Sequence, residues 1–449
     1  MNILFVSLGC DKNLVDSEIM LGMLAEKGYC FTDDESEADA VVINTCCFIN
    51  DAKEESINTI LEMAELKKSG KMKALLVTGC LAQRYKEEIQ EEIPEVDAIL
   101  GTTAILDITQ ALEEVLDGKS KNHMETLDKA PAGGMRRVVT TGGYYAYLKI
   151  AEGCNKHCTY CIIPKVRGNY RSIPMEALLK EAEELAGKGV KELILVAQES
   201  TLYGVDLYGK KSLPLLLRKL CKIEGFEWIR ILYCYPEEIT EELIQVIKEE
   251  DKICNYLDIP VQSGSDAVLK RMGRRTDAAQ IRQIVGMVRE QIPDICIRTT
   301  LIAGFPGETN EDHETTLEFV NEMEFDRLGV FVYSQEEDTP AAEMPDQIAE
   351  EVKEKRRDEI MELQQEIAFD AAEKMIGRSL KAMIEGRMED ENVYVARTYK
   401  DAPGIDGYLF INSESQLLSG DFVEVVVTAS NEYDLIGEIA ADSTEMEDK

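Results

Sequence analysis

Three of the twelve cysteines in this 449-residue chain fall within eight positions. Cys154, Cys158 and Cys161 follow an apolar run and a glycine with the spacing C-x3-C-x2-C. Zinc sites take four protein ligands, or three and a water, and no fourth Cys or suitable His pair lies nearby. Three thiolates on a four-iron cluster leave one iron without a protein ligand, which is what a catalytic site requires. We therefore expect a 4Fe-4S cluster here, with a zinc knuckle as the alternative.

A second set of cysteines emerges when each cysteine is placed relative to the apolar runs. Cys10 follows ILFVSLG, Cys46 follows AVVINT and Cys80 follows ALLVTG. The carboxyl ends of parallel strands lie side by side, and the intervals of 36 and 34 residues each equal one βα unit with its connection. A single cysteine is more often a packing residue than a ligand. Three cysteines at equivalent strand ends instead indicate an auxiliary 4Fe-4S cluster.

The other cysteines give no ligand spacing. Cys47 adjoins Cys46 and should point the opposite way along an extended chain, so we expect it in the core. Five more lie singly among apolar residues and are expected to pack in the interior: Cys30, Cys221, Cys234, Cys254 and Cys296. The chain has only three histidines, so the sequence offers few candidates for a histidine general base.

Alternating apolar runs and helical stretches must position these cysteines. Residues 1–117 show the rhythm of βα units, with helices over 16–27 and 51–68, and predict an N-terminal parallel α/β cluster domain. Residues 118–140 have no period and carry Gly, Pro and charge, so they are read as a linker.

Six further βα repeats follow the linker and predict a partial (β/α)6 barrel over 141–370. The expected strands are 145–150, 192–197, 228–233, 256–261, 296–302 and 328–333. A barrel of this kind presents its chemistry at the carboxyl ends of its strands, and the first of these ends leads directly to Cys154.

The last part of the chain has a different pattern. A charged helical stretch over 347–376 precedes five short alternating runs, which predict a small antiparallel β-barrel over 373–440. Residues 441–449 are expected to be a disordered acidic tail. The predicted barrel contains 13 acidic and 6 basic side chains, a net charge of −7. Such a domain should repel RNA and attract a basic protein.

Composition limits the classes of function. The net charge of −37 and the pI near 4.5 make nucleic acid a poor partner, although acidity could also serve solubility alone. No apolar run reaches the ~18 residues of a membrane span. The start of the chain lacks a basic leader, so we expect a cytoplasmic protein whose thiols stay reduced.

The two cysteine sets and this order of domains resemble the radical S-adenosylmethionine methylthiotransferase family, over nearly the whole chain. The resemblance implies an N-terminal cluster domain, a radical core and a C-terminal TRAM domain. It implies that the open iron at Cys154, Cys158 and Cys161 chelates S-adenosylmethionine, and that the cluster at Cys10, Cys46 and Cys80 handles the inserted sulfur. Two cofactor molecules would be consumed, with electrons from a donor such as flavodoxin or ferredoxin.

Within that family, the chain resembles the RimO branch, which modifies an aspartate of a small-subunit ribosomal protein. The first turn, from Gly9 to Glu18, is similar to that branch, although Asp11 stands where a proline is expected. The stretch from Ala197 to Gly204 also matches, except that Glu199 replaces an aspartate. The acidic C-terminal domain points the same way without relying on the resemblance.

Two residues are predicted to contact S-adenosylmethionine from this resemblance. Gln198 would hold the methionine end of the cofactor, although a Gln at a strand end more often orders a loop. Gly304 lies in a segment similar to the one that packs the adenine; by itself it marks only a strand-to-helix turn.

The sequence is thus interpreted as a methylthiotransferase that acts on the β-carbon of an aspartate in the small-subunit ribosomal protein numbered twelve. The first rival is a transfer-RNA adenosine methylthiotransferase, which would need a basic surface. The second is a non-catalytic electron-transfer protein, in which each cluster would need four ligands.

Overall fold

The apolar runs near the N-terminus form a five-stranded parallel sheet in the computed structural model, which describes residues 1–70, 72–389 and 392–440. Strands β3 (Ala40–Thr45) and β4 (Ala74–Gly79) are buried along their whole length at its centre. The remaining strands, in spatial order around that pair, are β2 (Cys30–Phe31) and β1 (Asn2–Ser7) on one side and β5 (Ala98–Leu100) on the other. The covering helices are α1 (Asp11–Glu26), α2 (Asn50–Lys68), α3 (Cys80–Arg84), α4 (Lys86–Glu92) and α5 (Ile108–Leu116).

Helix α1 begins five residues earlier than the helix predicted over 16–27. Its first turn is polar in sequence, yet Lys12, Asn13 and Asp16 are all buried. They are buried because this turn faces the next layer of the molecule, where Lys149 forms an ion pair with Asp16. Sequence periodicity reports burial of apolar residues and therefore misses a helix start that is buried by polar contacts.

Six parallel strands follow, as predicted, and confirm the partial barrel. They form two three-stranded sheets that meet through one isolated bridge between Ile229 and Ile253. In order they are β6 (Tyr145–Lys149), β9 (Glu192–Val196) and β10 (Trp228–Ile231), then β11 (Tyr256–Asp258), β12 (Cys296–Ala303) and β13 (Arg327–Val332). A short antiparallel ribbon, β7 (Ala151–Glu152) with β8 (Arg171–Ser172), extends from the first strand.

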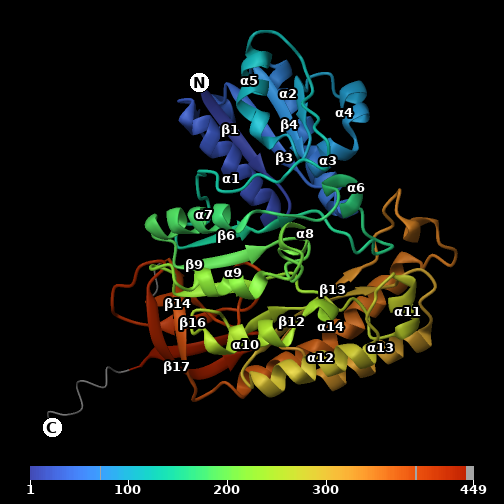
Figure 1. Ribbon diagram of the computed structural model, residues 1–449, viewed down its shortest axis with the longest axis vertical. Helices are drawn as coiled ribbons and strands as arrows, with labels where there is room; N and C mark the ends of the chain where they lie inside the picture. The colour runs from blue at the N-terminus through green and yellow to red at the C-terminus, as the bar shows by residue number, and fades with distance from the viewer. Residues whose placement is uncertain (71, 390–391, 441–449) are drawn as a thin grey trace.

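Helices cover the outer face of these strands, and the N-terminal sheet lies beyond β6 and α7 (Figure 1). The core between strands and helices is apolar and contains Leu148, Leu195 and Ile231. The helices are α6 (Ile163–Arg167), α7 (Met175–Gly187), α8 (Val205–Tyr208), α9 (Leu213–Leu220), α10 (Glu241–Glu249), α11 (Asp266–Arg271), α12 (Ala278–Gln291) and α13 (Asn310–Met323).

A long helix, α14 (Glu350–Glu373), leads from the core to the predicted C-terminal barrel, which is closed. Four of its strand pairs are antiparallel, whereas β16 and β18 run parallel. Its strands are β14 (Ser379–Arg387), β15 (Val393–Thr398), β16 (Leu409–Asn412), β17 (Phe422–Asn431) and β18 (Asp434–Ile439). The acidic tail predicted over 441–449 lies outside the described residues.

The segment read as a linker, 118–140, has no helix or strand but is not loose. The Arg137 guanidinium is buried against the carboxylates of Glu18 at 2.8 Å and Glu181 at 3.2 Å. It therefore ties α1 of the N-terminal sheet to α7 of the core. In the part of the chain that the structure describes, no helix combines the length and the apolar character needed to cross a membrane.

Candidate active site

The first three predicted ligands lie at one edge of the N-terminal sheet. Cys10 follows β1 and precedes α1, Cys46 follows β3, and Cys80 opens α3 directly after β4. Strands β1, β3 and β4 are neighbours and parallel, with Ser7 paired to Asn44 and Asn44 paired to Thr78. Their carboxyl ends, and the three cysteines beyond them, therefore share one edge.

Glycine makes the approach of these loops possible. Gly9 has φ +89°, and a Cβ at this position would lie 2.7 Å from Cys46 Cβ, so only glycine fits. Cys46 and Cys80 are buried, whereas Cys10 is exposed. Burial, together with the nearby Cys80 and Cys10 thiols, raises the pKa of the Cys46 thiol to about 12. The structure thus brings the three thiols of this set together.

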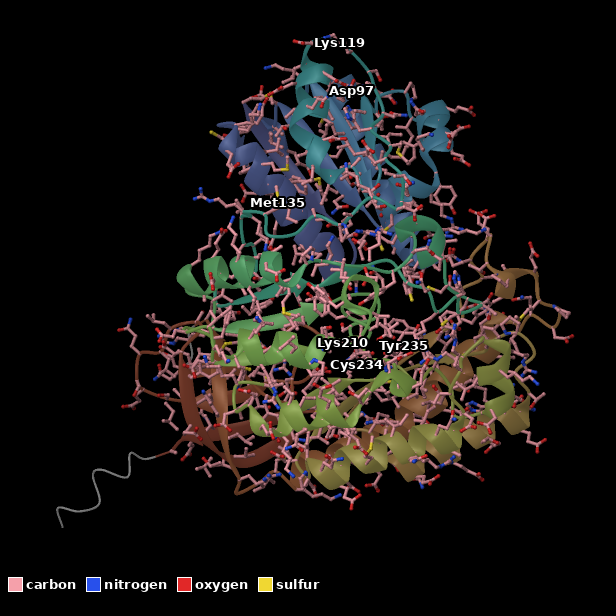
Figure 2. The ribbon with its side chains drawn as sticks, viewed as in Figure 1. Asp97, Lys119, Met135, Lys210, Cys234 and Tyr235 are labelled. Atoms are coloured by element: carbon pink, nitrogen blue, oxygen red, sulfur yellow. The ribbon has the colours of Figure 1, made fainter. Side chains whose placement is uncertain are left out.

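Cys154, Cys158 and Cys161 lie together in the loop between β7 and α6. The backbone N–H of Lys156 donates to Cys154 Sγ at 3.5 Å. Cys158 Sγ lies 3.4 Å from the Tyr235 hydroxyl and 4.0 Å from Arg274 Nη1. Burial raises the pKa of the Cys161 thiol to about 12, with further contributions from Cys158 and Cys154. This loop therefore offers three grouped thiols with hydrogen-bond donors around them, at the point where the strands of the core end. Tyr235, one of these donors, is labelled in Figure 2.

The arrangement has the chemistry of a cluster site. Thiolates are the ligands that iron–sulfur clusters use, and ligation requires the loss of the thiol protons, which burial otherwise retains. Among the described residues, no three His, Cys, Asp or Glu side chains are placed to hold a single metal ion. A four-iron cluster does not need that spacing, because its cysteines bind different irons.

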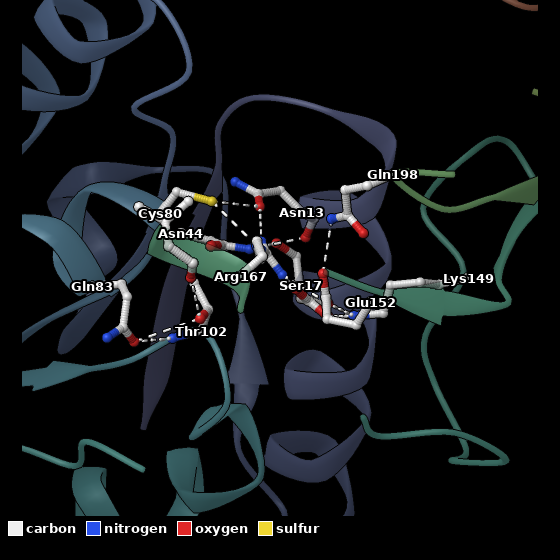
Figure 3. A network of polar contacts seen from close by, with 12 residues as sticks. Asn13, Ser17, Asn44, Cys80, Gln83, Thr102, Lys149, Glu152, Arg167 and Gln198 are labelled. Carbon is white, nitrogen blue, oxygen red and sulfur yellow. Dashed lines mark hydrogen bonds and ion pairs between the residues drawn. The ribbon is translucent and has the colours of Figure 1, made fainter. Parts of the chain in front are cut away.

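Arg167 links the helix that follows the Cys161 loop to Cys80 of the other set (Figure 3). It ends helix α6, which follows the Cys161 loop, and its guanidinium is buried. Nε donates to Cys80 Sγ at 3.3 Å, and a terminal nitrogen donates to the Asn13 amide oxygen. The other terminal nitrogen, Nη1, lies 2.7 Å from Asp16 Oδ2 and 3.0 Å from Glu152 Oε2.

The same network reaches the top of the core strands. Lys149 forms ion pairs with Asp16 and, at 2.9 Å, with Glu152. Glu152 Oε1 accepts from Gln198 Nε2 at 2.8 Å. Two cations therefore face two carboxylates, so the charges are balanced before any ligand binds. Because the network draws on α1, α6, β6 and β7, it holds the N-terminal sheet against the core in one orientation.

Several buried acceptors that follow strands of the core lack a donor. The amide oxygens of Gln198 and Gln262 and one carboxylate oxygen of Glu199 have no hydrogen-bond partner within the described ranges. Burial raises the pKa of Glu199 to about 7, opposed by hydrogen bonds from Thr201. Unpaired buried acceptors cost free energy, so they indicate a site that a ligand with amine and hydroxyl donors would complete.

The two residues predicted to contact S-adenosylmethionine have different surroundings. Gln198 lies just beyond β9 and, with its unpaired oxygen, fits a ligand-binding role. Gly304 has φ +74°, its amide donates to Glu308 Oε2 at 3.1 Å, and a Cβ there would collide with Lys353 of α14. Packing against α14 thus accounts for this glycine.

Three residues of the site were not found from the sequence. Arg167, Lys12 and Tyr235 touch or adjoin the cysteines, yet none has a spacing or repeat that marks it. Of the cysteines predicted to pack in the interior, Cys30 is exposed, because β2 is a two-residue edge strand. Cys47, by contrast, is fully buried in the sheet core, as predicted.

Comparison with protein families divides the chain into three matches. Residues 2–101 match the family described as Uncharacterized protein family UPF0004, residues 148–320 match the Radical SAM superfamily, and residues 376–440 match the TRAM domain. The second match covers the loop of Cys154, Cys158 and Cys161.

Two relatives are similar over nearly their full length. The ribosomal protein uS12 methylthiotransferase RimO of Lachnoclostridium phytofermentans is 63% identical over 97% of this chain and 99% of its own. That of Clostridioides difficile is 51% identical over 96% of this chain and 97% of its own.

Solved structures share the fold at low identity. The radical S-adenosylmethionine methyltransferase TsrM from Kitasatospora setae, with cobalamin and a [4Fe-4S] cluster bound, has a TM-score of 0.53 at 12% identity, covering 76% of this chain and 73% of that one. The cobalamin-dependent radical enzyme OxsB has a TM-score of 0.52 at 16% identity, covering 82% and 56%.

Proposed function

The chain belongs to the RimO family of ribosomal protein uS12 methylthiotransferases, and from this premise we propose that it replaces a hydrogen on the β-carbon of an aspartate in uS12 by a methylthio group. The observation that carries the proposal is 63% identity over 97% of the chain to a relative of that name. The chain is accordingly a radical S-adenosylmethionine methylthiotransferase.

We propose that each set of three cysteines holds one 4Fe-4S cluster. Cys154, Cys158 and Cys161 would hold the cluster that binds S-adenosylmethionine. When bound, this cluster would supply the electron that cleaves the cofactor and so starts hydrogen abstraction from carbon. Cys10, Cys46 and Cys80 would hold the auxiliary cluster, whose role is sulfur insertion.

The protein groups around the first set suit these tasks. The Tyr235 hydroxyl, the Lys156 amide and Arg274 are placed to donate hydrogen bonds to sulfur. Such bonds tune the potential of a cluster. The unpaired oxygens of Gln198 and Glu199 would accept from the amine and hydroxyl groups of S-adenosylmethionine. The adenine contact predicted for Gly304 remains part of the proposal.

The division of labour among domains is also proposed. Residues 1–117 would form the auxiliary-cluster domain, 141–370 the radical core and 373–440 the substrate-docking domain, with 118–140 between the first two. Three of the six cations of the C-terminal barrel are turned toward the core: Lys381 pairs with Glu227, Arg397 with Glu192 and Lys400 with Asp326. The net charge of −7 over 373–440 suits a basic ribosomal protein rather than RNA. We propose a cytoplasmic enzyme that receives electrons from flavodoxin or ferredoxin.

Anaerobic reconstitution tests the proposed function. The chain is loaded with iron and sulfide, then incubated with reductant, S-adenosylmethionine and either purified uS12 or transfer RNA. Mass spectrometry is expected to find one added methylthio group on an aspartate of uS12 and no change in the RNA. Modification of transfer RNA alone would contradict the substrate, and failure to cleave S-adenosylmethionine would favour an electron-transfer protein.

Replacing Arg167 by glutamine is expected to lower the rate of methylthio transfer by roughly 10- to 100-fold, as is typical for partners of metal ligands. The guanidinium donates to Cys80 Sγ. A cation and hydrogen bond at this sulfur favour the more negative, reduced cluster, so their loss should shift the potential of the auxiliary cluster to more negative values. Potentiometric titration followed by electron paramagnetic resonance measures this shift.

Lys149→Met is the matched control for Arg167. Lys149 belongs to the same buried network and pairs with the same two carboxylates, but it contacts none of the cysteines. This variant should loosen the contact between the sheet and the core without moving the potential of the auxiliary cluster. Equal shifts in both variants would mean that Arg167 acts only by holding the two parts of the molecule together.

A further inference from the structure

Lys12 lies near Cys10, where the first turn of α1 meets the segment that follows β10. It is the second residue of α1, two positions after Cys10, and its Nζ is 3.4 Å from the centre of the Tyr233 ring. Tyr233 follows β10, and two residues later the Tyr235 hydroxyl lies 3.4 Å from Cys158 Sγ. Lys12 and Cys158 thus each contact a tyrosine of the same short segment after β10.

This lysine is a buried cation that forms no ion pair with a carboxylate among the described residues. Four lysines of the described residues are buried, and three of them pair with carboxylates: Lys149 with Asp16 and Glu152, Lys156 with Glu237 and Glu238, and Lys353 with Glu350. Lys12 is 6% exposed and has no carboxylate oxygen within 4.0 Å in the same set of residues.

The neighbouring acid does not fill this role. Asp11 Oδ2 instead accepts a hydrogen bond from the Tyr233 hydroxyl at 3.1 Å. Burying a charge is costly unless it is paired, so a cation of this kind indicates an anionic ligand that is bound during function.

Tyr233 holds the lysine in place. Its backbone has φ +61°, a left-handed conformation that residues other than glycine rarely adopt, and its amide donates to Asp258 Oδ2 at 3.0 Å. The ring thereby lies against Lys12 and Asp11, at the N-terminus of α1. That helix end carries partial positive charge, which adds to the attraction for an anion.

We propose that Lys12 binds the side-chain carboxylate of the substrate aspartate and selects aspartate over neutral residues. This inference rests on the proposed function and adds the group that recognises the substrate. The reacting β-carbon must be reachable from both sets of cysteines. Lys12 follows Cys10 of one set, and its Nζ packs on the segment that carries Tyr235, the partner of Cys158 in the other. Without Lys12, the carboxylate of the substrate aspartate would approach the thiolates of both sets without a counter-charge.

The test compares two enzymes on two substrates. Wild-type and Lys12→Met enzyme, both reconstituted, are assayed with uS12 and with a uS12 variant whose modified aspartate is changed to asparagine. The measured quantity is kcat/KM for methylthio transfer. Wild-type enzyme should prefer aspartate by roughly 10- to 100-fold, the value of a charged hydrogen bond, and Lys12→Met should lose that preference.

Lys12→Arg and Lys400→Met are the accompanying variants. Lys12→Arg keeps the charge and should keep a preference for aspartate. This variant still tests the inference if the Lys12→Met protein does not fold. Lys400 also lies over a tyrosine ring, at 5.9 Å from Tyr399, but it is paired with Asp326 at the contact between the core and the C-terminal barrel. Lys400→Met should keep the full preference.

Each other outcome is decisive. If Lys12→Met lowers kcat/KM equally for both substrates, or loses iron while keeping the preference, Lys12 serves the auxiliary cluster and the inference is wrong. If wild-type enzyme modifies uS12 but does not distinguish aspartate from asparagine, the inference fails and the proposed function stands. If wild-type enzyme cleaves S-adenosylmethionine but modifies neither protein, the proposed function fails and the inference fails with it.

Discussion

Cys80→Ala enzyme is expected to carry about half of the wild-type iron, to cleave S-adenosylmethionine, and to form no methylthio product. The reason is the separation of the two sets of thiols: Cys80 opens α3 at the edge of the N-terminal sheet, whereas Cys154, Cys158 and Cys161 lie in the loop before α6. Loss of one thiolate from a three-cysteine set should remove the cluster it holds and leave the other. Iron and sulfide analysis, together with chromatography of 5′-deoxyadenosine and mass spectrometry of uS12, measures all three quantities.

Two further variants bracket this result. Cys154→Ala should lose cleavage of S-adenosylmethionine as well as the product, because both depend on the first cluster. Cys47→Ala changes a cysteine that adjoins Cys46 but is fully buried among apolar residues of the sheet. It should keep its full iron content and both activities. Full iron and normal product in Cys80→Ala would show that the N-terminal cysteines do not form a cluster site.

The positions of the cysteines could be predicted because strand periodicity and parallel topology are local and regular signals. The apolar runs before Cys10, Cys46 and Cys80 are strands, and their order in the sheet places the three ends at one edge. The partial barrel followed from six repeats of the same pattern, and the closed C-terminal barrel from five short alternating runs.

The polar contacts that complete the site could not be predicted in this way. Arg167 lies 87 residues from Cys80, and Lys12 lies more than 200 residues from Tyr233. A charged residue in a sequence is normally read as a solvated surface residue, and burial by a distant partner leaves no period. The early start of α1 was missed for the same reason, since its first turn is polar and yet buried.

The contact between the core and the C-terminal barrel contains a third such group, Glu192. Its carboxylate lies 2.7 Å from Arg230 Nε and 2.7 Å from Arg397 Nη2, and all three side chains are fully buried. Arg397 belongs to β15 and also pairs with Glu385, so the two guanidinium groups face two carboxylates. The C-terminal barrel is thus fixed to the core by buried charge.

Glu192→Gln is expected to lower the free energy of unfolding of this contact by about 3–5 kcal/mol, the usual cost of removing one partner from a buried ion pair. The substitution preserves shape but leaves two buried guanidinium groups with one carboxylate. Urea denaturation followed by fluorescence measures the change, because Trp228, the single tryptophan, packs edge-to-face on Phe422 of β17 at a centroid distance of 4.8 Å. The signal therefore reports separation of the barrel from the core.

The pH dependence distinguishes charge from packing. The two arginines lower the pKa of Glu192 below its ordinary value of 4.5, against the effect of burial, which raises it. A carboxylate with a lowered folded pKa stabilises the fold fully above its unfolded pKa and progressively less as the pH falls through the folded value. In the wild-type protein, the contact between the core and the barrel should therefore become less stable below about pH 4.5. In Glu192→Gln, the decrease caused by protonation of this carboxylate should be absent.

The matched control lies at the same interface. Glu227 pairs with Lys381 of β14 at 2.7 Å, but both side chains are about half exposed, so solvent screens the pair. Glu227→Gln should cost no more than about 1 kcal/mol, the usual limit for an exposed ion pair. Equal effects of the two substitutions would mean that apolar contacts such as Trp228 with Phe422, rather than the buried charges, hold the barrel to the core. A large effect confined to Glu192 would assign the orientation of the C-terminal barrel to a single buried carboxylate.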